Sequence, residues 1–270
     1  MTKPLIIAIL VYLGGFGVAQ ADPVNTLKDV SYGSHPRQIY DVYIPHKHSG
    51  RTYLVVHGGG WTKGDKAGLD IWQDKVAHWA PKGIAVVAMN YRFVPDVTPR
   101  DQAQDIGQAM AHLRDTLPTT KELVLIGHSA GAHLALLIHF DLALQQRAGG
   151  PSWDASIILD TSAIDVTGVM ERGPWHLWYD VFGRDPGVWP SYSPLDQMTK
   201  AGPPILAICS TLRPAPCPQN DLLKTRAASV DQSVDVFATD MDHLPINEQI
   251  GIDPKYTAKI DSWIDAQLSN

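Results

Sequence analysis

Short apolar runs that alternate with longer helix-like segments are the feature of this sequence that most restricts its fold. The apolar runs cover residues 40–44, 52–56, 84–88, 123–126, 156–159, 205–208 and 234–237. Helix-like segments cover residues 70–79, 101–114, 130–145, 221–228 and 254–267. Because most of the runs are continuously apolar, they are typical of parallel strands covered on both faces. The pattern predicts an α/β fold with a mostly parallel central sheet and helices on both of its faces.

Residues 166–200 interrupt this alternation and contain many aromatic residues together with several prolines and glycines. We expect this segment to form a small cap or loop excursion from the main domain. Its aromatic side chains either line a substrate pocket or pack the excursion onto the domain, and the sequence leaves both interpretations open. The rest of the 270-residue chain fits one domain, because α/β folds of this size often do not divide.

The N-terminal residues have the pattern of a signal peptide. Lys3 precedes an apolar run over residues 5–18, and Ala19 and Ala21 provide the small residues of a cleavage site. The alternative is a membrane anchor, but the run is shorter than the roughly 20 residues of a spanning helix. We therefore predict a signal peptide at 1–21, one α/β domain at 22–270, and export to the periplasm or the medium with no membrane association after cleavage.

Charge and cysteine content exclude some classes of function. The net charge is −6 and becomes −7 without residues 1–21, which argues against nucleic acid as a partner. The two cysteines, Cys209 and Cys217, are separated by seven residues, and in an oxidising compartment we expect a disulfide. The alternative is two reduced, partly buried thiols. A catalytic cysteine is disfavoured because no histidine lies nearby in the sequence.

The segment Gly127-His-Ser-Ala-Gly131 lies directly after the apolar run 123–126 and before an apolar helix-like segment. A serine on a sharp turn between strand and helix needs small neighbours so that the backbone can bend. The alternative is a serine that only caps the helix. The strand–turn–helix setting favours Ser129 as a nucleophile, with the positive end of the helix dipole beside it.

A second glycine-rich segment, His57-Gly-Gly-Gly-Trp61, follows the apolar run 52–56. Glycines at such a place can expose backbone N–H groups to a developing negative charge. We predict an oxyanion hole formed by the N–H groups of Gly59, Gly60 and Ala130. The alternative is a flexible loop without a role in catalysis.

Taken together, HGGGW and GHSAGAHLA resemble the esterase and lipase branch of the α/β-hydrolase superfamily. The chain is similar to its feruloyl-esterase-like, acetyl-esterase-like and kynurenine-formamidase-like members. The resemblance extends from Val30 to the C-terminal end and includes Tyr91-Arg92 and the segment DVYIP at residues 41–45. These motifs are specific for the superfamily, but they are weak evidence for a substrate.

The resemblance implies the order serine, acid, histidine along the chain, with the histidine on a loop after the last strand. His243 follows the apolar run 234–237, and no histidine follows it in the sequence. We therefore predict that His243 is the general base. His128, His133 and His139 lie in or after the GHSAG motif, and we expect them to pack in the interior.

The acid departs from the pattern of the family. In many relatives it follows the strand before the last one, but residues 210–216, after the run 205–208, contain no Asp or Glu. Asp160 stands at the end of the preceding apolar run, where strand ends face the same crevice, and we predict it as the acid. Asp165 is the second candidate, with a structural role as its alternative. Three further aspartates are weaker candidates: Asp221 as a helix N-cap, and Asp240 and Asp242 as solvated loop residues.

These residues predict a serine hydrolase that cleaves small acyl or aryl esters through an acyl-enzyme intermediate. An amidase of the arylformamidase kind would use the same residues. A non-catalytic binding protein on the same scaffold is a third hypothesis, because the usual acid position is empty. The chemistry needs no cofactor, and the sequence has neither an HExxH motif nor paired CxxC motifs to indicate a metal site.

Overall fold

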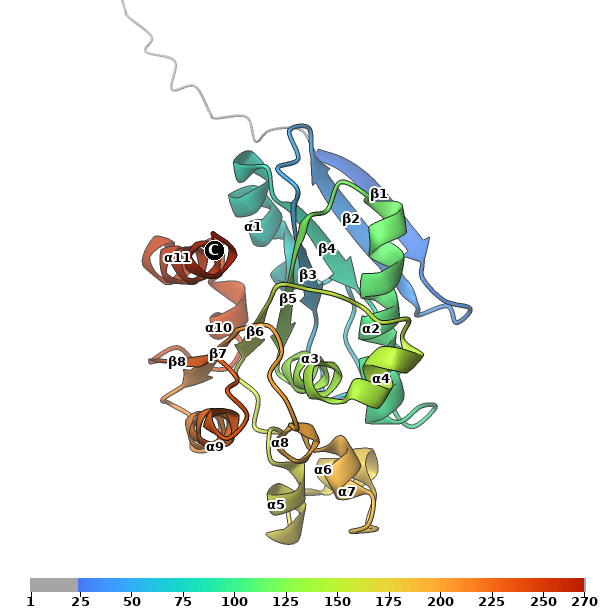
Figure 1. Ribbon diagram of the computed structural model, residues 1–270, viewed down its shortest axis with the longest axis vertical. Helices are drawn as coiled ribbons and strands as arrows, with labels where there is room; N and C mark the ends of the chain where they lie inside the picture. Colours follow the sequence, from blue (N-terminus) through green and yellow to red (C-terminus); the bar gives the residue numbers. More distant parts are fainter. Residues whose placement is uncertain (1–23, 270) are drawn as a thin grey trace, which may run out of the picture.

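A computed structural model describes residues 24–269, so the predicted signal peptide at 1–21 lies outside the described residues. The centre of the described domain is an eight-stranded sheet in the order β1-β2-β4-β3-β5-β6-β7-β8 (Figure 1). The strands are β1 (Val24–Ser31), β2 (Ile39–Pro45), β3 (Arg51–Val56), β4 (Ala85–Met89), β5 (Glu122–His128), β6 (Ala155–Leu159), β7 (Ile205–Ser210) and β8 (Val234–Thr239). The six strands from β4 to β8 in this order are parallel, whereas β1 and β2 are antiparallel to their neighbours.

Helices cover both faces of the sheet, as the continuously apolar strands predict (Figure 1). One face packs against α2 (Pro99–Thr116), α3 (Ala130–Phe140), α4 (Leu142–Arg147) and α9 (Pro216–Ala228). The other face packs against α1 (Leu69–Trp79), the 3-10 helix η1 (Ala80–Lys82), α10 (Pro245–Glu248) and α11 (Pro254–Leu268). Each face thus has its own apolar core, and the predicted fold class is confirmed.

Two of the predicted helices differ from those observed. The segment 130–145 forms two helices that meet at Asp141, whose carboxylate accepts a hydrogen bond from the Leu144 N–H and so starts α4. Helix α9 begins at Pro216, five residues before the predicted start, because its two prolines occupy the first turn, where no intrahelical N–H is needed. The prediction of Asp221 as an N-cap was therefore wrong, since it lies inside α9.

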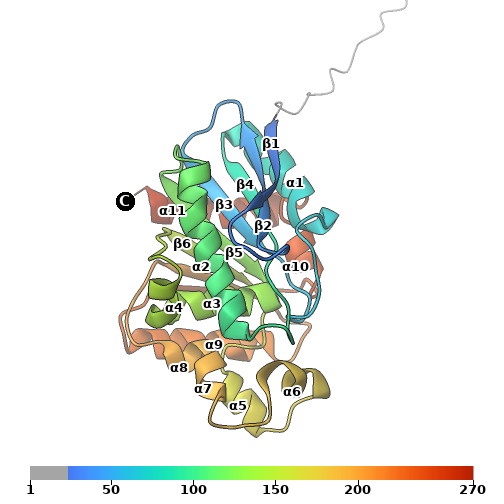
Figure 2. The same cartoon turned by 90° about the vertical axis from the view of Figure 1, so that its right-hand side faces the viewer.

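Residues 166–200 leave the sheet between β6 and β7 and form the cap, which lies at one end of the molecule in both views (Figures 1 and 2). The cap consists of four short helices, α5 (Val166–Glu171), α6 (His176–Phe182), α7 (Trp189–Tyr192) and α8 (Pro194–Gln197). Some of its aromatic residues pack the cap onto the domain, as one of the two interpretations predicts. Phe182 and Trp189 are buried in the core, whereas Trp175 is 75% exposed.

No helix among residues 24–269 is long and apolar enough to span a membrane.

Candidate active site

The predicted site residues follow the carboxyl ends of four parallel strands, which all end at the same edge of the sheet. The glycine-rich segment follows β3, Ser129 follows β5, Asp160 follows β6, and His243 lies on the loop between β8 and α10. Hydrogen bonds of the sheet continue into two of these loops. The Ser129 N–H donates to the Leu159 carbonyl and the Asp160 N–H donates to the Ile208 carbonyl, each at 2.8 Å.

Ser129 occupies the sharp turn that the GHSAG motif predicts. Its φ is +56°, in the left-handed region that non-glycine residues rarely adopt. The neighbouring glycines leave no room for side chains: a Cβ on Gly131 would lie 2.5 Å from the carbonyl oxygens of Val56 and His57, and one on Gly127 would lie 2.5 Å from the Gly131 oxygen. The turn and the start of α3 therefore pack directly against the end of β3.

The structure brings the three predicted triad residues into a chain of hydrogen bonds. Ser129 Oγ lies 3.0 Å from His243 Nε2, and His243 Nδ1 lies 2.6 Å from Asp160 Oδ2. With Nδ1 protonated and donating to the carboxylate, Nε2 can accept the proton of the serine hydroxyl. This is the arrangement that activates a serine as a nucleophile.

Asp160 is buried and has positive φ, like Ser129. Burial raises the pKa of its carboxyl, but hydrogen bonds from His243, the Ser210 N–H and Arg213 outweigh this and lower it below its ordinary value. The Ser210 N–H donates to Oδ1 at 2.8 Å, which leaves Oδ2 for the imidazole. Asp160 is thus held as an ionised carboxylate at the end of β6.

The other candidate acids lie elsewhere. Asp165 caps α5, accepting a hydrogen bond from the Gly168 N–H at 2.8 Å, which is the structural role given as its alternative. Asp242 accepts a hydrogen bond from the backbone N–H of His243 at 2.7 Å. Asp240 is exposed. Among the described residues, Asp160 is therefore the carboxylate that contacts the imidazole of His243.

The glycine-rich segment after β3 has the conformation that glycine permits. Gly59 has φ +112°, and a Cβ there would lie 2.0 Å from the Lys63 carbonyl oxygen; Gly60 has φ +59°. Within residues 24–269 the N–H groups of Gly59, Gly60 and Ala130 have no protein acceptor. Gly60 and Ala130 line one cavity together with Ser129, so their N–H groups are available to an oxyanion.

Tyr91, in the motif that follows β4, supports this glycine-rich segment from behind. Its hydroxyl donates to the His57 carbonyl at 3.0 Å, and its ring stacks on the His57 imidazole with ring centres 4.5 Å apart. The next residue, Arg92, forms an ion pair with the buried Asp105 of α2. The Tyr91-Arg92 motif therefore fixes the loop that carries the predicted oxyanion hole.

His128, which the sequence indicates only as a packing residue, also holds the loop of the predicted base. Its Nε2 lies 2.9 Å from the backbone oxygen of His243, and because a carbonyl only accepts, Nε2–H is the donor. Burial, and secondly the charge of nearby His243, lower the pKa of His128 to about 3. The ring is therefore neutral and keeps this tautomer at neutral pH.

Replacing His128 by phenylalanine is expected to lower kcat about tenfold. Phenylalanine keeps a ring of similar size but removes the donor, and an unsatisfied carbonyl costs about 1–3 kcal/mol. Steady-state kinetics and thermal unfolding of the variant would measure both effects. His128→Asn, which retains a donor, is the control. Equal kcat in the wild type and both variants would show that the bond does not position His243.

Four buried histidines make the fold sensitive to acid. Burial lowers the pKa of His57, His133 and His139 to about 4, and that of His128 to about 3. Their unfolded pKa is about 6.5, so below that pH the unfolded chain binds more protons and stability falls by about 1.4 kcal/mol per pH unit for each histidine. Denaturant unfolding is expected to show steep destabilisation between about pH 6.5 and about pH 4. An unfolding free energy that stays constant over this range would contradict the assignment, and His139→Leu should reduce the slope.

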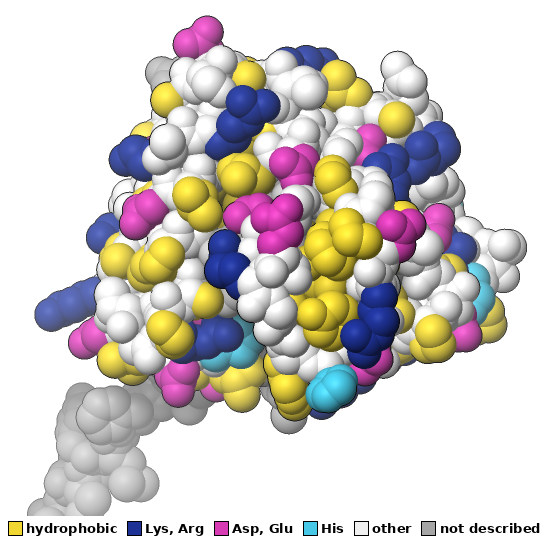
Figure 3. Space-filling model, turned by 90° about the horizontal axis from the view of Figure 1, so that it is seen from below, with side chains coloured by type: hydrophobic (Ala, Val, Ile, Leu, Met, Phe, Trp, Pro, Cys, Tyr) yellow, Lys and Arg dark blue, Asp and Glu magenta, His cyan; other side chains and the backbone are white. Residues whose placement is uncertain are grey.

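Two cavities meet at Ser129. The His243 cavity, of about 480 Å³, is bounded by the glycine-rich segment, His128, His243, Leu244 and Leu177. The tryptophan cavity, of about 360 Å³, is bounded by Trp61, Trp175, Trp178, Asp160 and Arg213. Figure 3 shows the end of the molecule that carries the cap, where hydrophobic side chains gather near the middle of the face with charged ones around them.

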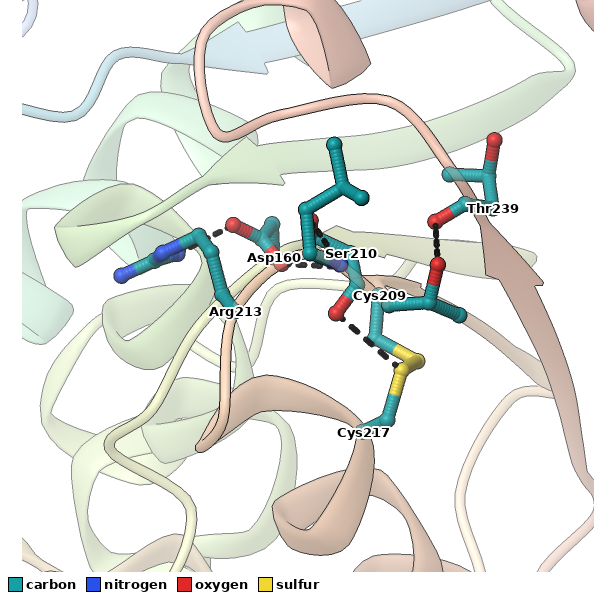
Figure 4. The surroundings of a disulfide bond; sticks show 8 residues. Asp160, Cys209, Ser210, Arg213, Cys217 and Thr239 are labelled. Atoms are coloured by element: carbon teal, nitrogen blue, oxygen red, sulfur yellow. Dashed lines mark hydrogen bonds and ion pairs between the residues drawn. A yellow bond between two sulfur atoms is a disulfide. The ribbon is translucent and has the colours of Figure 1, made fainter.

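The predicted disulfide between Cys209 and Cys217 is present, with an S–S distance of 2.06 Å. It joins the end of β7 to the first turn of α9 and closes the loop that contains Arg213 (Figure 4). In this loop, the usual place of the acid, Arg213 forms an ion pair with Asp160. Sequence reasoning missed this contact. The available signal was that residues 210–216 contain an arginine but neither Asp nor Glu.

No cluster of His, Cys, Asp or Glu that could hold a metal ion occurs among residues 24–269.

Comparisons with known proteins agree with this arrangement of the sheet and its helices. A family model described as BD-FAE matches residues 40–167, a little under half of the chain. A carbohydrate esterase from gut microbiota superposes with a TM-score of 0.76 at 16% identity, over 93% of this chain and 99% of that one. The chain has the α/β-hydrolase fold. The part that the family model covers runs from β2 to the start of α5 and contains both glycine motifs and Asp160.

Curated relatives match less than half of the chain. An isoprenylcysteine alpha-carbonyl methylesterase of Arabidopsis thaliana is 30% identical over 139 residues, which is 48% of this chain and 32% of that protein. A kynurenine formamidase of Salmo salar is 32% identical over 116 residues, covering 42% of this chain and 38% of that protein. The chain spans about a third of the length of these relatives.

Proposed function

We propose that this protein is a serine hydrolase that cleaves small carboxylic esters. The observation that carries the proposal is the hydrogen-bonded chain from Ser129 through His243 to the ionised Asp160, beside unpaired N–H groups of the glycine-rich segment. The esterase names among its relatives and structural neighbours support this reaction class.

In the proposed mechanism, Ser129 Oγ attacks the ester carbonyl carbon while its proton passes to His243 Nε2. The carbonyl oxygen becomes an oxyanion and accepts hydrogen bonds from Gly59, Gly60 and Ala130. When the carbonyl re-forms, the C–O bond to the alcohol breaks and the alcohol oxygen takes the proton from Nε2. Water then attacks the acyl-enzyme by the same route, releasing the acid and restoring Ser129. Asp160 stabilises the imidazolium formed in each half-reaction.

The two cavities divide the substrate between them. The leaving alcohol must receive a proton from His243 Nε2, and His243 borders the His243 cavity, so the alcohol occupies that side. The acyl group then occupies the tryptophan cavity, whose aromatic walls suit a flat or apolar acyl chain. Both volumes fit small groups.

A fluorophosphonate probe and 4-nitrophenyl acetate test the proposal. Folded protein is expected to be labelled, with the adduct located on Ser129 by peptide mass spectrometry, and to hydrolyse the ester. Heat-denatured protein is the control, because only an activated serine reacts. Folded protein that is neither labelled nor active would refute the proposal and favour the hypothesis of a binding protein.

Hydrolysis of an N-formyl arylamine is the second candidate function, favoured by the kynurenine formamidase relative. The same triad would cleave a C–N bond by protonating the amine. Comparing kcat/KM for phenyl acetate and formanilide separates the two candidates, and we expect the ester to be the better substrate.

We further propose that the protein is exported. The N-terminal pattern at residues 1–21 and the disulfide, which persists in oxidising compartments, support this. Cell fractionation with N-terminal sequencing tests it. We expect the mature protein outside the cytoplasm, beginning at Asp22; full-length protein in the cytoplasm would refute export.

A further inference from the structure

Arg213 lies in contact with two members of the predicted triad. Its Nη1 pairs with Asp160 Oδ2 and lies 2.7 Å from His243 Nδ1, while Nδ1 itself lies 2.6 Å from the same carboxylate oxygen. Figure 4 shows the guanidinium directed toward Asp160, on the side of the loop opposite the disulfide. No step of the proposed mechanism uses this arginine.

The contact between Arg213 and His243 cannot be a hydrogen bond in the active tautomer. Nε2 must be unprotonated to accept the serine proton, so Nδ1 carries a hydrogen and donates it to Asp160. Nη1 is also a donor, which leaves two N–H groups facing each other. Arg213 therefore acts on the imidazole through its positive charge.

This charge has two effects of the same sign. It opposes a second positive charge on the adjacent imidazole, and it neutralises part of the Asp160 charge that would favour one. Water screens both effects only in part, since the Arg213 side chain is 32% exposed and the Asp160 side chain is fully buried. Protonation of His243 by solvent, which inactivates a general base, is thus made harder.

Building on the proposed function, we propose that Arg213 is a positioning residue that keeps His243 unprotonated and extends activity toward lower pH. The covalent link between Cys209 and Cys217 closes the short loop and holds Arg213 at the carboxylate. An arginine suits this role because it stays charged at every pH at which the enzyme works.

Other charged groups around His243 do not supply the same effect. His128 is neutral, and Asp242 contacts only the backbone N–H of His243. Lys63 and Asp65, which carry opposite charges, border the His243 cavity. The charge of Lys75 contributes to lowering the pKa of His128. Arg213 is the cation that contacts the imidazole among the described residues.

The test is the acid limb of the pH profile, measured from about pH 5 to about pH 9 with 4-nitrophenyl acetate. Arg213→Gln is expected to move the limb of kcat/KM to higher pH by about one unit, because it removes a charge in direct contact. Arg213→Lys keeps the charge and should stay close to the wild type. Arg172→Met, which removes an exposed arginine of the cap, is the matched control and should leave the limb in place.

The rate of fluorophosphonate labelling of Ser129, followed over the same pH range, gives a second profile that needs no turnover. Arg213→Met provides a second charge-free variant if Arg213→Gln does not fold. The proposal would be overturned if the acid limb of a folded variant without the Arg213 charge coincided with that of the wild type. A lower kcat with an unchanged acid limb would show that Arg213 has only a structural role. Wild-type protein without labelling or turnover would instead refute the proposed function.

Discussion

Replacing Ser129 by alanine is expected to lower kcat for ester hydrolysis by about 10⁶-fold and to abolish fluorophosphonate labelling. The remaining residues cannot form an acyl-enzyme, and removal of a triad serine costs a rate factor of this size in other hydrolases. End-point assays at high enzyme concentration would measure the residual rate. The substitution removes one oxygen. Alanine and serine both carry a Cβ and are strained to a similar degree at φ +56°, so the thermal stability should change little.

The matched control for Ser129→Ala is Ser162→Ala, which removes a hydroxyl from the border of the tryptophan cavity that makes no contact with His243. We expect its kcat to stay within a few-fold of the wild type. If Ser129→Ala kept most of the activity, a different nucleophile would have to be sought, and the triad assignment would be wrong.

Asp160→Asn is expected to lower kcat by about 10⁴-fold while the protein still folds. Asparagine keeps the shape of the side chain but favours the wrong imidazole tautomer and removes the charge that stabilises the imidazolium. The Ser210 N–H can still donate to the amide oxygen, so the end of β6 should keep its conformation. Kinetics at saturating substrate, together with circular dichroism of the variant, would measure both effects.

Asp165→Asn separates the two sequence candidates for the acid. It removes the charge of a residue that caps α5 and does not contact His243, so we expect nearly normal kcat and a small loss of stability. A large loss of kcat in Asp165→Asn, with activity retained in Asp160→Asn, would reverse the assignment.

The sequence predicts most of the fold because most of the strands are continuously apolar and alternate with helical segments along the chain. Strand β1 was missed, since Val24–Ser31 is an edge strand that pairs with β2 alone and is largely exposed, so it has no apolar pattern. The break at Asp141 and the early start of α9 were missed for local reasons. Both depend on where one helix begins: Asp141 caps the first turn of α4, and two prolines occupy the first turn of α9. The apolar pattern of the sequence does not locate these starting residues.

The candidate site was predicted in its parts but not in its contacts. Ser129 and His243 follow from motif and order, and Asp160 follows from the rule that parallel strands end at one edge. The interactions of Arg213 and His128 depend on the reach of long or buried side chains across different loops. Such contacts have no periodic signal, so the three-dimensional arrangement is needed to identify the two residues of each contact.

The cap enters the chain between β6 and β7, after Asp160 and before the loop of Arg213, and contributes Trp175, Leu177 and Trp178 to the cavity walls. The three predicted triad residues thus lie outside this insertion, whereas part of the cavity walls lies within it. Under the proposed function, we expect that exchanging this one insertion between related enzymes changes the preferred ester and leaves Ser129, His243 and Asp160 in place.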